Sequence, residues 1–591
     1  MAAIWKDYDH FDLVTYLTAY YINEHSNAEL EEDIDRFLAY SPMKKIYIEN
    51  HRGNVDVPVA RLQEIQKIFE DRGIKTSGGI VTTALVDGKK KPSIFDTFCY
   101  TDEAHKARLM GLIEDLATVF DEIILDDFFF TACRCEKCIE AKGKLSWSEY
   151  RRNTMNAFAE KMVARAHEIN PKMNFIIKYP AWYKSYHETG YNPGKQKEIF
   201  DSFYTGTETR DPIYNAQHMQ RYHSYAIMRW MENANPGKNQ GGWIDAGQAS
   251  GNYNVFLEQC EQTVLAKTKE LMLWNFAQMV RPDDYCLPIL GKDMIRLDKI
   301  AGQLGNPVGV SVYEPFNSDG EDLLYNYFGM EGIACEPQQF FNEDAPTILL
   351  TASSACDPDI IEKMKKYLRN GGHIVMTTGF MHRTYETGIR DLTSMQFMDR
   401  VIEGYEYMIR NRNYAASGGT VNGSFPVAFE ALQGKDNASW GDVTVCAREF
   451  NSPIFTEEDY GNGRLYLLNV PQNPADLYRL PQAVWETIAR HISEGQKVYV
   501  ASDEKVCFFA YDNNKYVIQN YGKHESNIRV VVRGAFKGLR DIESGKVYDL
   551  VIPLPAPSTP GDGCAVFPEE PLSYVDIQIG TGVYRCFEVI E

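Results

Sequence analysis

Two adjacent carboxylates and three closely spaced cysteines stand together between Asp126 and Cys138. The acids close the run EIILDD (122–127), which is apolar and β-branched until it reaches them. Such a run is typical of a buried parallel strand, here with carboxylates at its carboxyl end. A carboxyl pair at a strand end can supply an acid and a base to a pocket. Strand alternation would direct Asp126 and Asp127 to opposite faces, and we expect Asp127 to be the acid/base with Asp126 as an orienting or substrate-binding partner.

The cysteines Cys133, Cys135 and Cys138 form a C-x-C-x-x-C motif directly behind the acids. Thiolates at this spacing bind one tetrahedral ion when a fourth ligand arrives from elsewhere, and zinc is the usual occupant. Cys99 is the expected fourth ligand, with His105 as its alternative. Four protein ligands leave no open position, so the predicted zinc is structural. The competing interpretation is three reduced surface cysteines.

The elements that would position these groups alternate between short apolar runs and helical patterns up to about residue 300. One helical pattern, SNAELEEDIDRFL, opens with a capping box formed by Ser26 and Glu29. The eight apolar runs are LVTYLTAY (from 13), KIYIEN (45), KTSGGIVTT (75), EIILDD (122), NFIIKYP (174), IFDSFYTG (199), GGWIDAG (241) and ELMLWNF (270). Eight such units predict an α/β fold with a (β/α)8 TIM barrel over residues 1–304, in which chemistry sits at the carboxyl ends of the strands. An open doubly wound sheet is the alternative.

Two further domains are predicted after the barrel. Residues 305–496 contain strand, helix, Gly-Gly turn and strand patterns that indicate a flavodoxin-like α/β domain, which also resembles a class I amidotransferase fold. Cys356 lacks the glycines of a nucleophile elbow, so we expect this domain to serve assembly. Short alternating runs in residues 497–591 predict a β-sandwich.

Composition limits the partners. The 591 residues carry 61 basic and 82 acidic side chains, a net charge of −21, which would repel nucleic acid and anionic membranes. No run of about 18 apolar residues suits a membrane span, and no nucleotide-binding glycine motif follows a strand, so we expect no membrane association and no organic cofactor. Scattered cysteines suit a reducing compartment; we expect a cytoplasmic protein, or a periplasmic or secreted one if a leader was removed.

Further carboxylates follow other predicted strands. Asp245 ends the seventh run and is the expected second carboxylate, while Glu208, in YTGTETRD after the sixth run, is its rival. Glu208 could equally join a loop network with Arg210 or Asp211 that has no chemistry. The remaining candidates for substrate binding also lie at strand ends: Glu49, Asn50, His51, Lys178, Tyr179, Trp182, Trp243, Gln248, Trp274 and Asn275. Aromatic rings among them suit sugar faces, although each ring alone suits a barrel core as well.

An acid-ended strand followed by C-x-C-x-x-C, with Cys99 on the preceding loop, resembles the glycoside hydrolase family 42 β-galactosidases. The likeness extends over the chain, since that family combines a barrel, a flavodoxin-like trimerisation domain and a short β-sandwich, and its cysteine cluster binds zinc. The resemblance implies a carbohydrate substrate and a homo-oligomer, a trimer or dimer. The sequence departs from the family where Asp126-Asp127 stands in place of Asn-Glu and Asp245 in place of the nucleophilic Glu.

These observations predict a glycosidase that cleaves a glycoside or short oligosaccharide with paired carboxylates and without a catalytic metal. The expected mechanism is retaining, with Asp127 as acid/base and Asp245 as nucleophile. Carboxyl groups about 5–5.5 Å apart would retain configuration, and a gap of about 6.5–9.5 Å would invert it. The alternatives are a carbohydrate-binding or scaffold protein that has lost activity and a zinc-dependent hydrolase, which would need an open metal position.

Overall fold

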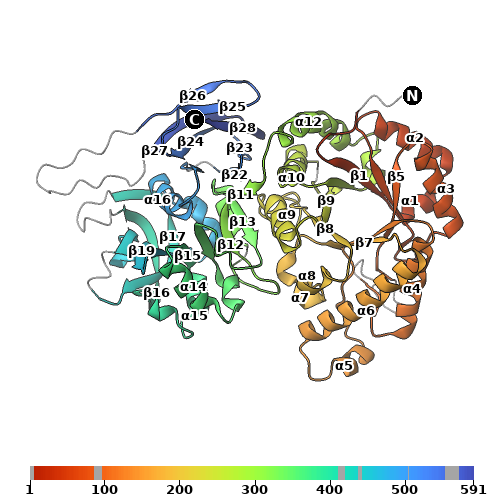
Figure 1. Cartoon of the computed structure of the whole chain (residues 1–591), viewed down its shortest axis with the longest axis horizontal. Helices are drawn as coiled ribbons and strands as arrows, with labels where there is room; N and C mark the ends of the chain where they lie inside the picture. Colours follow the sequence, from red (N-terminus) through yellow and green to blue (C-terminus); the bar gives the residue numbers. More distant parts are fainter. Residues whose placement is uncertain are drawn as a thin grey trace, which may run out of the picture. The chain divides into compact units, whose positions relative to one another are not determined.

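The computed structural model describes residues 6–84, 96–249, 251–321, 323–409, 420–436, 442–502, 505–552 and 572–591. The chain forms two compact units, Met1–Gln303 and Leu304–Glu591. Figure 1 shows the elements of each unit. Within the described residues, no helix has the length and apolar character needed to cross a membrane.

The first unit is a closed barrel of eight parallel strands, which confirms the TIM-barrel prediction and excludes the open sheet. The strands are β1 (Asp12–Leu17), β2 (Lys45–Glu49), β5 (Lys75–Ile80), β6 (Glu122–Leu125), β7 (Asn174–Tyr179), β8 (Ser202–Gly206), β9 (Asn239–Asp245) and β10 (Glu270–Trp274). Each pairs with its neighbours along the sequence, and β10 closes the barrel on β1 in the register Asp12 to Glu270. All eight predicted strands are therefore present in the predicted order.

Helices surround this barrel (Figure 1). The longer ones are α2 (Asn27–Leu38), α3 (Val59–Glu70), α4 (Glu103–Ala117), α6 (Trp147–Ile169), α9 (His223–Ala234), α10 (Tyr253–Leu265) and α12 (Cys286–Ala301). The predicted capping box starts α2: Ser26 and Glu29 satisfy each other's backbone N–H groups. The same helix buries Leu30, Ile34 and Phe37 as one stripe. Helix α6 begins with a second capping box, formed by Ser146 and Glu149.

Large side chains fill the barrel interior. A buried cluster takes residues from seven of the eight strands: Val14, Tyr16, Tyr47, Ile124, Ile176, Tyr204, Trp243 and Met272. The remaining strand, β5, contributes Gly79, where an added Cβ would lie 2.6 Å from the Tyr16 hydroxyl. Glycine at this position makes room for the Tyr16 ring, so the barrel is a packed core below the site.

The second unit begins with a doubly wound sheet. The strands β13 (Cys335–Gln338), β12 (Val310–Tyr313), β14 (Thr347–Leu350), β15 (His373–Thr377) and β20 (Gly463–Leu468) lie side by side in this order and are parallel. Numbered by position along the chain, this is the 2-1-3-4-5 order of flavodoxin-like folds. Helices in this unit include α13 (Leu324–Met330), α14 (Ile360–Arg369), α15 (Thr378–Thr384) and α16 (Gln482–Ile492).

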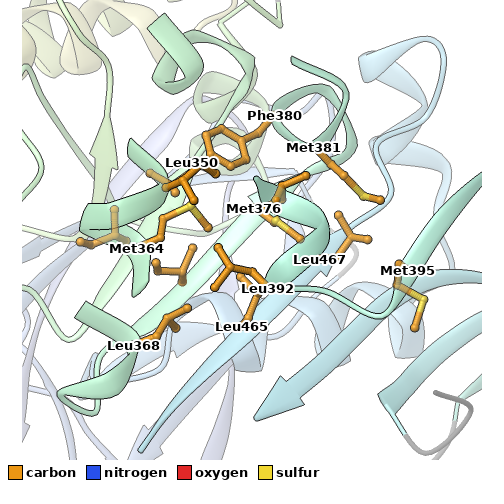
Figure 2. Packing of buried hydrophobic residues seen from close by; sticks show 14 of the residues in the cluster. Leu350, Met364, Leu368, Met376, Phe380, Met381, Leu392, Met395, Leu465 and Leu467 are labelled. Carbon is orange, nitrogen blue, oxygen red and sulfur yellow. The ribbon is translucent and has the colours of Figure 1, made fainter. Parts of the chain in front are cut away.

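Antiparallel strands β19 (Ser452–Tyr460), β18 (Val443–Ala447), β16 (Met395–Ile409) and β17 (Thr420–Gly434) extend the same sheet. Figure 2 shows its apolar packing, in which Leu350, Met376 and Leu465 from three neighbouring strands meet Met364 and Leu368 of α14. Met395 at the start of β16 belongs to the same buried cluster, so the added strands share the core of the parallel part.

The last part of the chain, together with the short strand β11 from the start of the second unit, forms two facing sheets, as predicted for a β-sandwich. One has the order β11-β22-β23-β28-β25-β26, the other β21-β24-β27. Their bounds are β11 (Pro307–Val308), β22 (Val506–Tyr511), β23 (Lys515–Asn520), β28 (Val583–Ile590), β25 (Gly538–Asp541), β26 (Val547–Asp549), β21 (Val498–Val500), β24 (Ser526–Arg533) and β27 (Leu572–Ile579). Phe508 and Ile518 of the first sheet and Val530 and Ile577 of the second share one core. The division of this unit after residue 496 stays a prediction.

Candidate active site

A cavity of about 630 Å³ lies at the carboxyl ends of the barrel strands. Lys178 of β7, Asp245 of β9 and Trp274 of β10 come from the last residues of their strands. The full lining is Arg52, Asp126, Asp127, Phe128, Lys178, Ala181, Trp182, Arg210, Ala216, Gln217, His218, Met219, Trp243, Asp245, Gln248 and Trp274. This is the end of a TIM barrel at which catalytic sites are built.

Asp126 and Asp127 both line this cavity, although strand alternation directed them to opposite faces. The reason is that β6 ends at Leu125 and the chain turns at Asp127, so alternation no longer applies to the pair. Asp126 Oδ1 accepts the backbone N–H of Asp127 at 2.7 Å. The Asp127 side chain is 20% exposed and that of Asp126 is 5% exposed. Both carboxyl groups therefore belong to one site, and Asp127 is the more open of the two.

Lys178 provides the central cation of the cavity. Its ammonium lies 3.2 Å from Asp127 Oδ2, 3.0 Å from Glu208 Oε1 and 3.8 Å from Asp126 Oδ1. It also stands 4.2 Å from the centre of the Trp243 ring, within the range of a cation–π contact. Burial alone would lower the pKa of Lys178, but the surrounding carboxylates outweigh burial and raise it above its usual value. The lysine is thus held as a cation among acids.

The two adjacent acids have opposite pKa shifts. Burial, and after it repulsion from the Asp127 carboxylate, raises the pKa of Asp126 to about 7, against the opposing attraction of Lys178. Burial is also the largest influence on Asp127 and opposes its ionisation, but attraction and hydrogen bonding to Lys178, with smaller contributions from Asp126 and Arg210, together outweigh burial and lower the pKa of Asp127 below its usual value. Like charges this close cannot both ionise freely, so the pair holds one proton near neutral pH, and the shifts favour Asp126 as its site.

Asp245 is the second carboxylate on the wall. Its Oδ1 accepts the indole N–H of Trp243 at 3.2 Å, and its Oδ2 accepts from Arg210 Nη2 at 3.2 Å. Arg210 also donates from Nε to Gln248 Oε1, which ties the loop after β8 to the loop after β9. One guanidinium donor and one indole donor thus fix the orientation of the Asp245 carboxylate through both of its oxygens.

Glu208 lies behind the wall, and its side chain is 1% exposed. Its Oε1 accepts from Lys178, while its Oε2 is buried and has no hydrogen-bond partner. Burial raises the pKa of Glu208, with Lys178 opposing and the Asp245 carboxylate adding to the shift. The structure thus brings Glu208 to Lys178, but it does not bring Glu208 to the cavity surface.

Arg52 is a wall residue that the sequence reasoning missed. Its guanidinium donates twice to Glu49, at 2.8 and 3.0 Å, and once to Asp126 Oδ2 at 3.1 Å. It also lies 4.5 Å from the centre of the Trp274 ring. Glu49 itself is fully buried and accepts from Tyr16 and the backbone of Ala19, so it acts as the support for Arg52. The signal available in the sequence was the position of Arg52, directly after the candidates Glu49 to His51.

Besides Glu49, four predicted substrate-binding residues do not appear in the described lining of the cavity. Asn50 donates to Leu112 O, and His51 contacts Asp56 and Thr83 O. Tyr179 donates to Gln196 and packs among aromatic rings on the helix side of β7, and Asn275 caps α11 (Phe276–Met279) by accepting from Gln278 N–H. Their polar atoms serve loops and helix ends around the barrel mouth.

Three predicted tryptophans do reach the wall: Trp182, Trp243 and Trp274. Trp243 and Trp274 stack with ring centres 5.6 Å apart, and Gln248 lies beside them in the lining. A segment that the sequence analysis did not single out, Ala216 to Met219, completes the wall. The cavity therefore combines flat apolar rings with charged and amide groups, which is the mixture expected of a sugar site.

The four cysteines predicted as metal ligands form one cluster. The Sγ atoms of Cys99, Cys133, Cys135 and Cys138 all lie within 4.8 Å of one another. The Sγ atom of Cys99 lies 3.8 Å from that of Cys135 and 3.6 Å from that of Cys138, and the last two are 3.6 Å apart. Zn–S bonds of about 2.3 Å give tetrahedron edges of roughly 3.8 Å, so the donor set fits a zinc ion. His105 instead accepts the backbone N–H of Cys99.

Comparison with known proteins identifies three matching segments. Residues 2–286 match the family described as probable glycosyl hydrolase, catalytic domain. Residues 305–473 match the second domain of the uncharacterized protein SSO3021, and residues 497–563 match a probable glycosyl hydrolase C-terminal domain. The uncharacterized protein SSO3021 of Saccharolobus solfataricus is 28% identical over 302 residues, which is 46% of this chain and 50% of that protein. The match thus spans about half the length of this curated relative.

Solved structures resemble the whole chain. A β-galactosidase from Bacillus circulans sp. alkalophilus has a TM-score of 0.66 at 11% identity, covering 98% of this chain and 99% of that one. The GH42 β-galactosidase Gan42B from G. stearothermophilus scores 0.62 at 11% identity with 98% of each chain covered, and an α-L-fucosidase from Paenibacillus thiaminolyticus scores 0.61 at 10%, covering 99% and 100%. At such identities the likeness shows the fold. The barrel unit thus matches the family of probable glycosyl hydrolase catalytic domains, and the chain as a whole shares its fold with β-galactosidases of known structure.

Proposed function

We propose that this protein is a glycoside hydrolase that cleaves a glycoside or a short oligosaccharide with carboxylates from two sides of its barrel mouth. One observation carries the proposal: Asp126, Asp127 and Asp245 line a single cavity of about 630 Å³ together with three tryptophans. Glycosidic bond cleavage needs one carboxylic acid for the leaving oxygen and one carboxylate on the other side of the sugar. The family of the barrel unit supports the same reaction class.

The acid/base function is assigned to the Asp126–Asp127 pair. A general acid must hold its proton at the working pH, and a pKa of about 7 for Asp126 suits that task. Asp127 is the more exposed carboxyl, and its pKa is lowered. Sequence reasoning favoured Asp127 as the acid/base; the electrostatics support a proton that resides on Asp126 and a neighbouring Asp127 anion that raises its pKa. The two acids therefore act as one coupled unit.

Asp245 is the proposed nucleophile of a retaining reaction. In the first step a bond forms between its carboxylate oxygen and the anomeric carbon, the glycosidic bond breaks, and the leaving oxygen takes the acid's proton. In the second step water loses a proton to the base and attacks the same carbon, which releases Asp245. Asp245 is preferred to Glu208 because Asp245 lines the cavity, whereas the Glu208 side chain is 1% exposed.

The sugar ring is expected to pack on the aromatic wall. Trp243 and Trp274 form a stacked pair beside Asp245, and Trp182 also lines the cavity. Gln248 can bind sugar hydroxyl groups through its amide. Apolar C–H faces of the ring match the tryptophans, while hydroxyl groups match the amide and charged side chains.

A zinc ion bound by Cys99, Cys133, Cys135 and Cys138 would clamp the loop that follows Asp127. Four thiolates complete the coordination of zinc, which argues against a zinc-dependent hydrolase because that chemistry requires an open position. The loop reaches the cluster from Asp127 through Phe129, which is buried, and Thr131, whose N–H donates to Thr189 O. Zinc bound by this cluster would therefore restrict the motion of the loop that follows the acid pair.

The test is a panel of nitrophenyl α- and β-glycosides with the first-formed product anomer followed by NMR. Retention of configuration supports Asp245 as nucleophile, and inversion would replace this step by direct attack of water. D245N should abolish turnover on every substrate. Variants D126N and D127N should lose most activity on poor leaving groups and keep more on 2,4-dinitrophenyl glycosides, because an activated leaving group needs no acid.

Azide gives a second measurement on the same enzymes. In a retaining enzyme, azide added to D245G should produce a glycosyl azide of inverted configuration, since the small anion replaces the missing carboxylate. Wild-type protein that binds sugars in calorimetry but cleaves none of the panel would instead favour a carbohydrate-binding protein on a glycosidase fold.

We also propose that the protein is a cytoplasmic homo-oligomer, a dimer or trimer. The eleven cysteines in the described ranges are all free thiols, which suits a reducing compartment. The long strands β16 and β17 leave Val401, Tyr405 and Phe425 at least half exposed, and apolar side chains of this size are typical of subunit contacts. Light scattering coupled to size-exclusion chromatography measures the assembly, and a monomer at micromolar concentration would contradict it.

A further inference from the structure

Arg210 has an unusual backbone at the cavity wall. Its φ angle is +63°, in the left-handed region that L-residues with side chains rarely adopt. Within the described lining of the cavity, it is the one residue with a positive φ. Such a conformation costs free energy and persists only where surrounding contacts impose it. Contacts around Arg210 must therefore hold its backbone in this conformation.

Gln259 of α10 provides the holding contact. Its Oε1 accepts two successive backbone N–H groups, from Thr209 at 2.9 Å and from Arg210 at 3.1 Å. The side chain is buried, and its Nε2 donates to Val255 O at 3.0 Å within the same helix. Both the oxygen and the nitrogen of the Gln259 amide are thus hydrogen-bonded, and the amide attaches the loop after β8 to a helix outside the barrel. Unpaired, the two N–H groups would each incur a desolvation penalty.

This backbone conformation places the Arg210 guanidinium beside Asp245. Arg210 Nη2 donates to Asp245 Oδ2 at 3.2 Å, and Nε donates to Gln248. The Arg210 and Asp245 side chains are only 10% and 11% exposed, so their charges attract through a partly desolvated medium. Burial alone would lower the pKa of Arg210, but the nearby Glu208 and Asp245 carboxylates raise it. The guanidinium therefore remains charged beside Asp245.

We propose that Arg210 is a positioning residue for Asp245 and that Gln259 holds Arg210 in its left-handed conformation for this purpose. The proposal rests on the glycosidase function above, because it names what orients the attacking carboxylate. The guanidinium holds Oδ2 while the Trp243 indole holds Oδ1, so rotation of the carboxylate is restricted on both oxygens. A fixed carboxylate needs less reorganisation before it attacks the anomeric carbon.

Substitution by glycine separates the backbone from the guanidinium. R210G removes the side chain and also relieves the left-handed strain, whereas R210A removes the side chain and keeps the strain. We expect both variants to lose at least about 100-fold in kcat with a smaller change in KM, because positioning acts on the transition state. R210G should have the higher Tm of the two. Added guanidinium ion should recover part of the kcat of R210G by occupying the vacated site beside Asp245.

Gln259 is tested with an isosteric pair. Q259L removes the acceptor and should lower kcat, while Q259E, whose neutral carboxyl still accepts the two N–H groups and donates to Val255 O, should recover most of that loss. Two matched controls report on non-specific effects. Lys267 also has a positive φ, of +69°, in the same unit, so Lys267→Gly relieves strain away from the cavity, and Asn254→Ala changes an exposed position of α10. Both controls should leave kcat/KM unchanged.

The possible outcomes separate a failure of the positioning role of Arg210 from a failure of the proposed glycosidase function. Wild-type protein without turnover on any glycoside would refute the proposed function, whereas active wild type with a normal kcat in R210G would refute the positioning role alone. Loss of activity in R210G without rescue by guanidinium, in a variant that keeps the wild-type circular dichroism spectrum, would also overturn it. The Tm values of R210G and R210A test the backbone strain independently of activity. Equal Tm values would show that the left-handed backbone at residue 210 does not destabilise the protein.

Discussion

The ammonium group of Lys178 lies 3.2 Å from Oδ2 of Asp127, and this ion pair determines how the two neighbouring acids share their charge. Contacts with Lys178 outweigh burial and lower the pKa of Asp127, whereas burial, and after it repulsion from the Asp127 anion, raises the pKa of Asp126. Burial and the unequal contacts with Lys178 thus separate two chemically identical side chains into a carboxylate and a carboxylic acid. The pH dependence of the enzyme follows from this separation.

The wild-type enzyme should lose activity as the pH rises above about 7. An acid catalyst acts only when protonated, and Asp126, with a pKa of about 7, is protonated below that pH and ionised above it. We expect kcat/KM on a phenyl glycoside to fall roughly tenfold per pH unit on the alkaline side. A profile that stays flat to pH 9 would exclude Asp126 as the proton donor.

Removal of the neighbouring charge should move this alkaline limit to lower pH. In D127N the repulsion that raises the pKa of Asp126 is gone, while Lys178 and Arg52 remain to stabilise the Asp126 anion. The pKa of Asp126 therefore falls, and the residual kcat/KM should decline from a lower pH than in the wild type. The same pH series on D127N measures the shift, and an upward movement would contradict the assignment.

Removal of the cation should move the limit the other way. Lys178→Met keeps the length of the side chain but removes the charge that attracts both acids, so the pKa of the Asp126–Asp127 pair rises and the alkaline limit moves to higher pH. We expect kcat to fall by on the order of 100-fold as well, because the carboxylates lose their shared ion pair. Lys184→Met, in the nearby loop after β7, serves as the control that leaves the limit in place.

Loss of a cysteine ligand should lower zinc content and stability together. Cys135 is exposed, so Cys135→Ser removes a thiolate without opening a core cavity. We expect purified wild type to contain one zinc per chain by mass spectrometry, Cys135→Ser to contain much less, and its Tm to fall by several degrees. Cys356→Ser, an exposed cysteine outside the cluster, should leave both values unchanged. Wild type free of metal after purification from zinc-supplemented cells would refute the site.

A second ionic cluster, at the opposite end of the barrel, should affect stability without affecting catalysis. Lys45 lies 2.6 Å from both Glu122 and Glu270, and its side chain is 9% exposed. Lys45→Met leaves two partly buried carboxylates without their cation, so the free energy of unfolding should fall by about 3 kcal/mol. Denaturant titration measures this change, with the exposed Lys75→Met as control. Unchanged kcat and KM are expected in both variants because the site lies at the other end of the strands.

The elements of this protein could be predicted from its sequence because their signals are local. Eight apolar runs, such as EIILDD and NFIIKYP, are each bounded by polar residues, and the capping box of Ser26 and Glu29 marks a helix start within four residues. Closely spaced cysteines likewise predicted their own cluster, since the C-x-C-x-x-C motif brings three ligands together and only Cys99 had to arrive from another loop. Hydrophobic period and ligand spacing depend on neighbours along the chain.

The candidate active site depended on contacts that no local pattern contains. Alternation separated Asp126 from Asp127, but the strand ends at Leu125 and the turn brings both acids to one cavity. Likewise, Tyr179 follows Lys178 directly, yet only Lys178 points into the mouth, because adjacent strand residues face opposite sides of the barrel. What the sequence alone determined was the fold and the kinds of group at the strand ends. Which groups meet, and which acid keeps its proton, was decided by tertiary structure, because pKa values and ion pairs depend on distances between segments far apart in the chain.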